Sequence, residues 1–147
     1  MESLFEAVGG DAGLRRLAEA WHRRMLADEV AAHPFQRDIH PQHTERLAAY
    51  WGEALGGPPV YSERFGGETR VVRIHSGNGE HDDMNRRAIA CFDQALGDAG
   101  VPAHARGPLH DYFAWATTTT MYRYRDSAAD VPPGLAVPHW SWNGRAG

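Results

Sequence analysis

The stretch Leu4-Phe5-Glu6-Ala7-Val8-Gly9-Gly10 describes a very short helix followed by a sharp turn. The glycine pair predicts the turn, because glycine adopts backbone conformations that other residues resist. We therefore expect a first helix over about residues 3–7. A second helix should follow at once, with Asp11 as its N-cap and an apolar stripe at helical spacing. The stripe consists of Leu14, Leu17, Ala18, Trp21 and Met25.

Three longer segments further along the chain show the same helical spacing of apolar residues. The first is expected to start near Pro41 and to end at Gly56-Gly57-Pro58-Pro59. The second is expected to be capped by Asn78 and to end by Gly100, and the third to begin near Pro108. The periodicity therefore predicts an all-α protein.

Two segments fit this helical pattern poorly. The connection over residues 58–67 is rich in glycine and is expected to be a loop, and Thr69-Arg70-Val71-Val72-Arg73-Ile74 is the one strand-like stretch. The run Thr117–Thr120 has weak helix propensity, so packing must hold that turn.

Size and composition are those of one soluble domain. The chain has 147 residues, with 42% hydrophobic and 23% charged residues. A net charge of −4 argues against a nucleic-acid partner. We find no signal peptide and no apolar run long enough to cross a membrane, and Cys91 is the only cysteine. We therefore expect a cytoplasmic protein without disulfides.

Histidine is abundant, with nine residues in so short a chain, and haem sites use histidine and aromatic side chains. His75 follows Val71, Val72 and Ile74, which provide the apolar surroundings that an iron-binding imidazole needs. His22 and His43 are expected to face inward from neighbouring helices. Either could hydrogen-bond a ligand on iron, coordinate iron directly, or be a partly buried surface residue.

Other chemistries find less support in the sequence. His40 and His43 share a helix face, but no third ligand for zinc is evident. No nucleophile occupies a recognisable turn motif, and no glycine-rich phosphate loop is present.

Four landmarks occur in one order: Gly9-Gly10, Gly56-Gly57-Pro58, Tyr61-Ser62-Glu63, and a histidine at position 75. This pattern resembles the group II truncated haemoglobins, a branch of the globin superfamily. The resemblance implies an all-α truncated globin, a two-on-two helical sandwich with haem between the helix pairs. It places the globin domain at residues 1–126. Residues 127–147 form an extra C-terminal extension, which we expect to dock on the domain because it contains Trp140 and Trp142.

The resemblance also implies roles for individual residues. His75 corresponds to the proximal ligand of the haem iron, and Phe35 to the aromatic residue that stacks on the porphyrin. The expected distal-pocket residues are His22, His43, Phe35, Leu47, Ala88 and Trp21. At the haem edge, arginine side chains match the geometry of the propionate carboxylates, and a tyrosine offers a hydroxyl. These candidates are Tyr61, Arg64, Arg70 and Arg73.

The distal side departs from the family pattern. His22 stands where the family carries tyrosine, and Ala88 stands where it usually carries tryptophan, which is expected to open the pocket. We therefore expect a haem b protein that binds oxygen, NO, CO, cyanide or peroxide at iron. Because Ala88 widens the distal side, redox or detoxifying chemistry (peroxidase-like or NO dioxygenase-like), or sensing, is favoured over simple oxygen storage. An electron-donating reductase is a candidate partner.

Two questions stay open at the level of the sequence. The chain is compatible with a monomer or a homodimer. The alternative function is a globin-fold interaction module that has lost haem. Absorbance distinguishes the two functions, since only a haem protein shows a Soret band.

Overall fold

The computed structural model describes residues 2–32, 42–75, 82–120 and 127–146. Its α-helices are α1 (Leu4–Ala7), α2 (Gly10–Ala27), α3 (His43–Ala54), α4 (Val60–Arg64), α5 (Glu68–His75), α6 (Asp82–Asp98) and α7 (Ala103–Trp115). A π-helix, η2 (Ala116–Thr120), continues α7, and a 3-10 helix, η3 (Ala128–Asp130), opens the C-terminal segment. Strands β1 (His139–Ser141) and β2 (Gly144–Ala146) form an antiparallel hairpin, in which Trp140 pairs with Arg145. The all-α class predicted from periodicity is confirmed.

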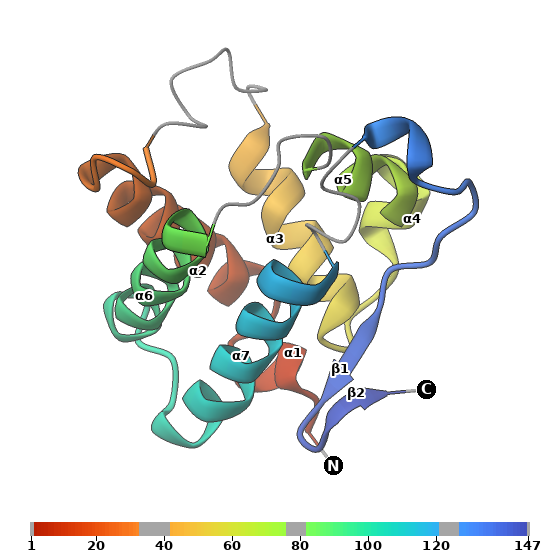
Figure 1. The fold of residues 1–147 in the computed structure, drawn as a ribbon. Coiled ribbons are helices and arrows are strands. Elements are labelled where there is room, and N and C mark those ends of the chain that lie inside the picture. The colour runs from red at the N-terminus through yellow and green to blue at the C-terminus, as the bar shows by residue number, and fades with distance from the viewer. Residues whose placement is uncertain (1, 33–41, 76–81, 121–126, 147) are drawn as a thin grey trace.

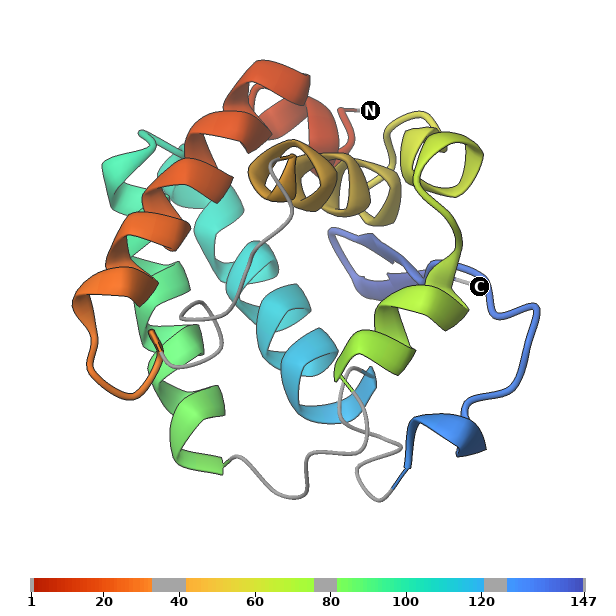
Figure 2. The same cartoon turned by 90° about the horizontal axis from the view of Figure 1, so that it is seen from above.

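The helices pack as pairs around one core (Figures 1 and 2). Helix α2 packs on α3 and α6, and α6 packs on α7. In both views α2 and α6 lie on one side, α4 and α5 lie on the other, and α3 and α7 lie between them. Aromatic rings fill the centre of this core. The rings of Phe92 and Phe113 are stacked with their centroids 4.2 Å apart, and Trp51 packs edge-on against Phe92 with a centroid distance of 5.4 Å. Offset and edge-on contacts of this kind add to the apolar burial that holds the helices together.

The start of the chain differs in detail from the expectation. Ser3 caps α1 by accepting a hydrogen bond from the Glu6 amide at 3.1 Å. Asp11 is not an N-cap; α2 begins at Gly10, and Gly9 occupies the cap position with a φ of 103°. That left-handed conformation suits glycine, and α2 starts two residues earlier than expected. Asp11 lies instead in the first turn, where its carboxylate faces the positive end of the helix.

Two segments expected to be non-helical are helices. The glycine-rich connection contains α4, and the strand-like stretch from Thr69 to Ile74 lies in α5. The β-branched residues of α5 belong to a helix because packing against the rest of the fold buries both Val71 and Val72. Tertiary packing thus outweighs the local β propensity.

Helix α7 starts earlier than expected. It begins at Ala103, after Pro102, and includes Pro108 in its second turn. The threonine run forms the π-helix η2, where the Thr118 hydroxyl donates to the Ala114 carbonyl at 2.7 Å. Such side-chain hydrogen bonds compete with regular helix geometry. The expected starts at Pro41 and Asn78 lie outside the described residues.

The C-terminal segment contacts both α7 and the start of the chain. The Trp140 ring lies 5.3 Å from that of Trp115, and the Trp142 indole N–H donates to the Glu2 carbonyl at 2.7 Å. The hairpin was not expected from the sequence. Within the described ranges, no helix is long and apolar enough to span a membrane.

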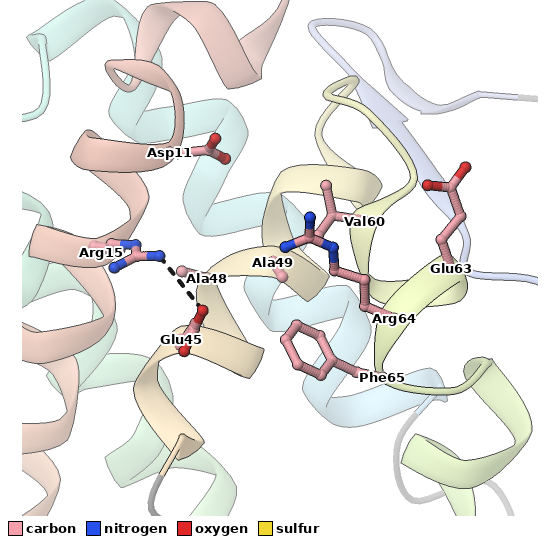
Figure 3. Close-up of a pocket in the computed structure, with 9 residues that line it drawn as sticks. All are labelled: Asp11, Arg15, Glu45, Ala48, Ala49, Val60, Glu63, Arg64 and Phe65. Atoms are coloured by element: carbon pink, nitrogen blue, oxygen red, sulfur yellow. Dashed lines mark ion pairs between the residues drawn. The ribbon is translucent and has the colours of Figure 1, made fainter.

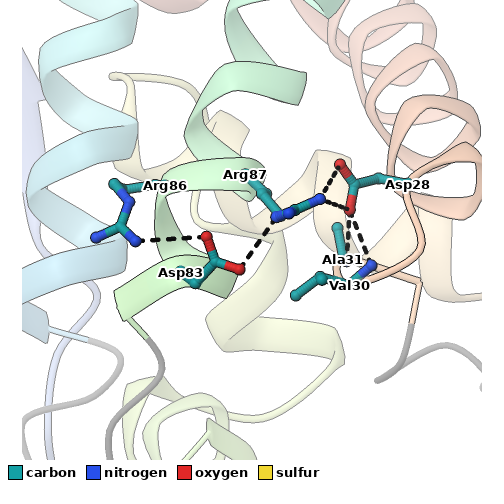
Figure 4. Close-up of polar contacts among 6 residues, drawn as sticks. All are labelled: Asp28, Val30, Ala31, Asp83, Arg86 and Arg87. Atoms are coloured by element: carbon teal, nitrogen blue, oxygen red, sulfur yellow. Dashed lines mark hydrogen bonds and ion pairs between the residues drawn. The ribbon is translucent and has the colours of Figure 1, made fainter.

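Ion pairs link α2 to α6 near the end of α2 (Figure 4). The Asp28 carboxylate accepts backbone hydrogen bonds from Val30 and Ala31 at 3.0 and 2.9 Å, and from the Arg87 guanidinium at 3.2 Å. The Ala31 amide is the main cause that lowers the pKa of Asp28, and Arg87 adds to it. Nearby, Arg24 makes two hydrogen bonds to Asp98 at 2.7 and 2.8 Å. These ion pairs therefore attach the end of α2 and the turn after it to α6.

Candidate functional site

His75 is the last residue of α5, and its ring is held in one orientation. Its Nδ1 lies 2.8 Å from the Val71 carbonyl oxygen, one helical turn earlier. Because a carbonyl only accepts, Nδ1 carries the proton and the lone pair is on Nε2. Burial lowers the pKa of His75, which favours the neutral ring. A neutral imidazole with its other nitrogen bonded to a carbonyl is a typical metal ligand.

His22 and His43 come together from two helices. His22 projects from the second half of α2 and His43 from the first residue of α3, and their ring centroids lie 5.6 Å apart. Both side chains are half-buried. Burial lowers the pKa of His22, so its ring tends to be neutral. The sequence singled out both residues, but only the fold places them side by side.

A hydrogen bond also joins Trp21 on α2 to Ala88 on α6. The Trp21 indole N–H donates to the Ala88 carbonyl at 3.1 Å, and both residues are buried. The same indole meets Trp51 edge-on at 5.9 Å. The Ala88 backbone carbonyl is thus engaged by Trp21, and the wider distal pocket at position 88 stays a prediction. Leu47 is half-buried against the core, and Phe35 lies outside the described residues.

The candidates for the haem edge have different environments. Tyr61 is buried beside Tyr50, and burial raises its pKa although Arg70 and Arg46 oppose that effect. Arg73 donates to the Val131 carbonyl at 3.2 Å, and Arg64 is exposed. The charge of Arg70 therefore acts on the Tyr61 hydroxyl, whereas the Arg73 guanidinium is hydrogen-bonded to the C-terminal segment.

Sequence reasoning missed Arg46, which lies one turn after His43 on α3. Its guanidinium carbon lies 5.1 Å from the centroid of the Phe65 ring. Its Nε is buried and has no hydrogen-bond partner within the described part of the chain. A buried cationic N–H of this kind calls for an anionic acceptor. The i,i+3 spacing from His43 was the signal that could have revealed it.

A second missed feature is a buried carboxylate at the start of α5. Glu68 is 2% exposed and accepts hydrogen bonds from the Tyr50 hydroxyl at 2.7 and 3.0 Å. This interaction joins α3 to the helix that carries His75. Its residues are far apart in sequence, so no local pattern indicates it.

A cleft of about 300 Å³ opens between α2, α3 and α4 (Figure 3). Arg15 and Glu45 form an ion pair at 3.6 Å on one side, and Arg64 lies on the other. Ala48, Ala49, Val60 and Phe65 contribute apolar surface. None of the three histidines discussed above lines this cleft, but Phe65, whose ring packs against the Arg46 guanidinium, does.

Residues 3–121 match the family described as bacterial-like globins. The chain belongs to that family. It is 26% identical over 123 residues to the group 1 truncated hemoglobin GlbN of Synechocystis sp., covering 75% of this chain and 99% of that protein. It is 30% identical to the hemoglobin of Chloroflexus aurantiacus, with a TM-score of 0.71, covering 82% of this chain and 98% of that one.

A third relative shares the fold at lower identity. The group II truncated hemoglobin of Bacillus anthracis has a TM-score of 0.70 at 21% identity, covering 80% of this globin and 88% of that chain. Relatives of this globin thus include group 1 and group II proteins, and the truncated-globin fold is common to all of them.

Membership of the globin family implies a haem cofactor, and this chain's side chains fit one. The orientation of His75 leaves the lone pair on Nε2, the atom by which imidazole ligates haem iron. The buried Nε of Arg46 suits a propionate carboxylate, because guanidinium binds carboxylate well. Helix α5 thus offers a candidate iron ligand, and helix α3 offers a candidate site for a propionate.

Proposed function

We propose that this globin holds haem b through His75 and presents His22 and His43 to a small ligand. The observation that supports it best is the hydrogen bond from His75 Nδ1 to the Val71 carbonyl at 2.8 Å. It orients the ring and fixes its tautomer before any metal is bound. When bound, haem iron supplies the affinity for oxygen, NO, CO, cyanide or peroxide.

His22 and His43 supply polarity to the distal side in this proposal. A neutral imidazole carries one N–H donor, which can hydrogen-bond a dipolar ligand in surroundings of low polarity. The 5.6 Å separation of the two rings allows both to act on one small molecule. Trp21 keeps the neighbouring core dry, because its ring packs against α6 and Trp51.

The haem edge is proposed to lie beside Arg46. Its buried Nε and its stacking on Phe65 favour an anion there, and Arg70 and Tyr61 share the neighbourhood. Arg64 and Arg73 are weaker candidates, since the Arg64 side chain is exposed and Arg73 donates to the Val131 carbonyl.

The finer classification is also a proposal. The order of the glycine and aromatic landmarks supports group II, although a relative is a group 1 protein. Two histidines on the distal side favour redox or detoxifying chemistry with a reductase over oxygen transport. A cytoplasmic location and a monomeric or homodimeric state complete the proposal.

The decisive experiment is haem reconstitution of the full chain and of His75→Ala. We expect the natural sequence to take up one haem with a Soret band. His75→Ala should lose haem faster, on the order of 100-fold, and added imidazole should slow that loss.

His139→Ala, which changes an exposed histidine, is the matched control. A natural chain without a Soret band would support the haem-free interaction module instead, and unchanged haem retention in His75→Ala would exclude His75 as the ligand.

A further inference from the structure

Helix α5 is bonded to the segment that follows the globin family match. The Thr69 hydroxyl donates to the Pro132 carbonyl at 3.0 Å and accepts from the Leu135 amide at 2.9 Å. One turn later, the Arg73 guanidinium donates to the Val131 carbonyl at 3.2 Å. Residues 69 and 73 share a helix face, so these hydrogen bonds form one continuous attachment. The family match ends at residue 121, before this segment begins.

Apolar burial follows the same interface. Val72 and Val131 are 1% and 2% exposed, yet both lie outside the main core cluster. A small cavity of about 140 Å³ lies between α5, α7 and the C-terminal segment, and its lining includes Val72, Trp115 and Leu135. The C-terminal segment thus completes the packing around one face of α5.

The far end of the segment is firmly anchored. Trp140 packs on Trp115 at 5.3 Å, and the Arg145 guanidinium lies 5.3 Å from the centroid of the same Trp115 ring. The Trp142 indole N–H donates to the Glu2 carbonyl. Figure 1 shows the segment running from η3 beside α5 down to the hairpin near the N-terminus. A segment anchored in this way can restrain the helix that it crosses.

We propose that residues 127–146 form a strap that positions α5 and therefore His75, with Thr69 and Arg73 as positioning residues. The inference rests on the proposed function for the role of His75. Helix α5 has eight residues, and a helix this short depends on packing for its stability. His75 is its last residue, so movement of α5 displaces the imidazole directly.

The test compares three full-length variants with haem bound. Thr69→Val keeps the side-chain shape but removes the hydroxyl, whereas Thr69→Ser keeps the hydroxyl. Thr118→Val is the matched control, because the Thr118 hydroxyl donates to the Ala114 carbonyl one turn earlier in the same helical run and not to the C-terminal residues 127–146. We expect haem transfer to an excess of apomyoglobin to become roughly five- to tenfold faster in Thr69→Val, as two hydrogen bonds are lost. Thr69→Ser and Thr118→Val should stay close to the natural chain.

One spectroscopic measurement and one amide-exchange measurement distinguish a change in the position of His75 from a general loss of stability of the fold. The iron–histidine stretching band should shift or broaden in Thr69→Val and recover in Thr69→Ser. In the haem-free chain, Thr69→Val should speed amide exchange in residues 68–75 while α2 and α3 stay protected. Arg73→Met should act in the same direction.

The possible failures are distinguishable. The strap proposal would be overturned if Thr69→Val and the natural chain showed the same rate of haem loss, the same iron–histidine band and the same amide exchange in residues 68–75. Loss of protection throughout the molecule would also overturn it, since the effect would be on the whole fold. If the natural chain takes up no haem, the proposed function fails, and exchange in residues 68–75 still decides whether the strap holds α5.

Discussion

At the scale of single residues, the Tyr50 hydroxyl makes a buried hydrogen bond to Glu68. Burial raises the pKa of Tyr50 well above its ordinary value, so the hydroxyl keeps its proton and remains a donor. We predict that Tyr50→Phe lowers the free energy of unfolding by about 1–3 kcal/mol, because a buried carboxylate loses a hydrogen bond. Urea unfolding of the haem-free chain measures it. Tyr61→Phe is the control, because the Tyr61 hydroxyl makes no hydrogen bond within the described ranges; equal losses in both variants would contradict the prediction.

At the scale of elements, the turn after α2 is attached to α6 through Asp28 (Figure 4). The pKa of Asp28 is lowered in the folded chain, chiefly by the Ala31 amide. Its carboxylate therefore stabilises the fold above the ordinary pKa of aspartate, near 3.9, and this contribution is lost as the pH falls through the lowered pKa. We predict that Asp28→Asn is less stable than the natural chain at pH 7 and that the difference shrinks below about pH 4. Urea midpoints across this pH range provide the measurement.

The control for this element is Asp111→Asn on α7. Asp111 is exposed and forms no ion pair with the residues that the structure describes. Its substitution should leave the pH dependence of stability unchanged. A constant difference between Asp28→Asn and the natural chain from pH 7 to pH 3 would show that the carboxylate's charge contributes nothing.

At the scale of the whole molecule, the two ends of the described chain are joined. The Trp142 indole N–H donates to the Glu2 carbonyl at 2.7 Å, and its ring stacks on His104 at 5.5 Å. We predict that Trp142→Phe keeps the stacked ring but lowers the free energy of unfolding by about 0.5–1.5 kcal/mol through loss of the N–H donor. Amide exchange should rise in α1 and in the hairpin together. Faster exchange in only one of them would show that they are not coupled.

Local sequence predicted α1 and the helices with a regular apolar stripe, but not α4, α5 or the start of α7. Helices α2, α3 and α6 show a regular apolar stripe, because each buries one face over several turns. Helix α5 contains Val71 and Val72, which locally favour strand, and its helical state depends on packing that no local window contains. The start of α7 does not follow from the sequence, because proline favours the first position of a helix, whereas α7 accommodates Pro108 in its second turn.

The candidate site divides in the same way. Landmarks along the chain singled out His75, His22 and His43, since residue type and order are properties of the sequence. Arg46 was missed because nothing along the chain shows that its Nε is buried against Phe65. The hydrogen bond from the Trp21 indole to the Ala88 carbonyl likewise appears only in the folded chain, because its partners lie on different helices.

The sequence by itself determined the helical class, the positions of the main helices and the histidines that deserve testing, because these depend on periodicity and order along the chain. The tertiary structure alone decided which of those residues meet. The 5.6 Å approach of His22 to His43 and the attachment of Thr69 to residues 132–135 join segments far apart in sequence. Such contacts follow from how helix faces pack, and packing is a property of the whole fold.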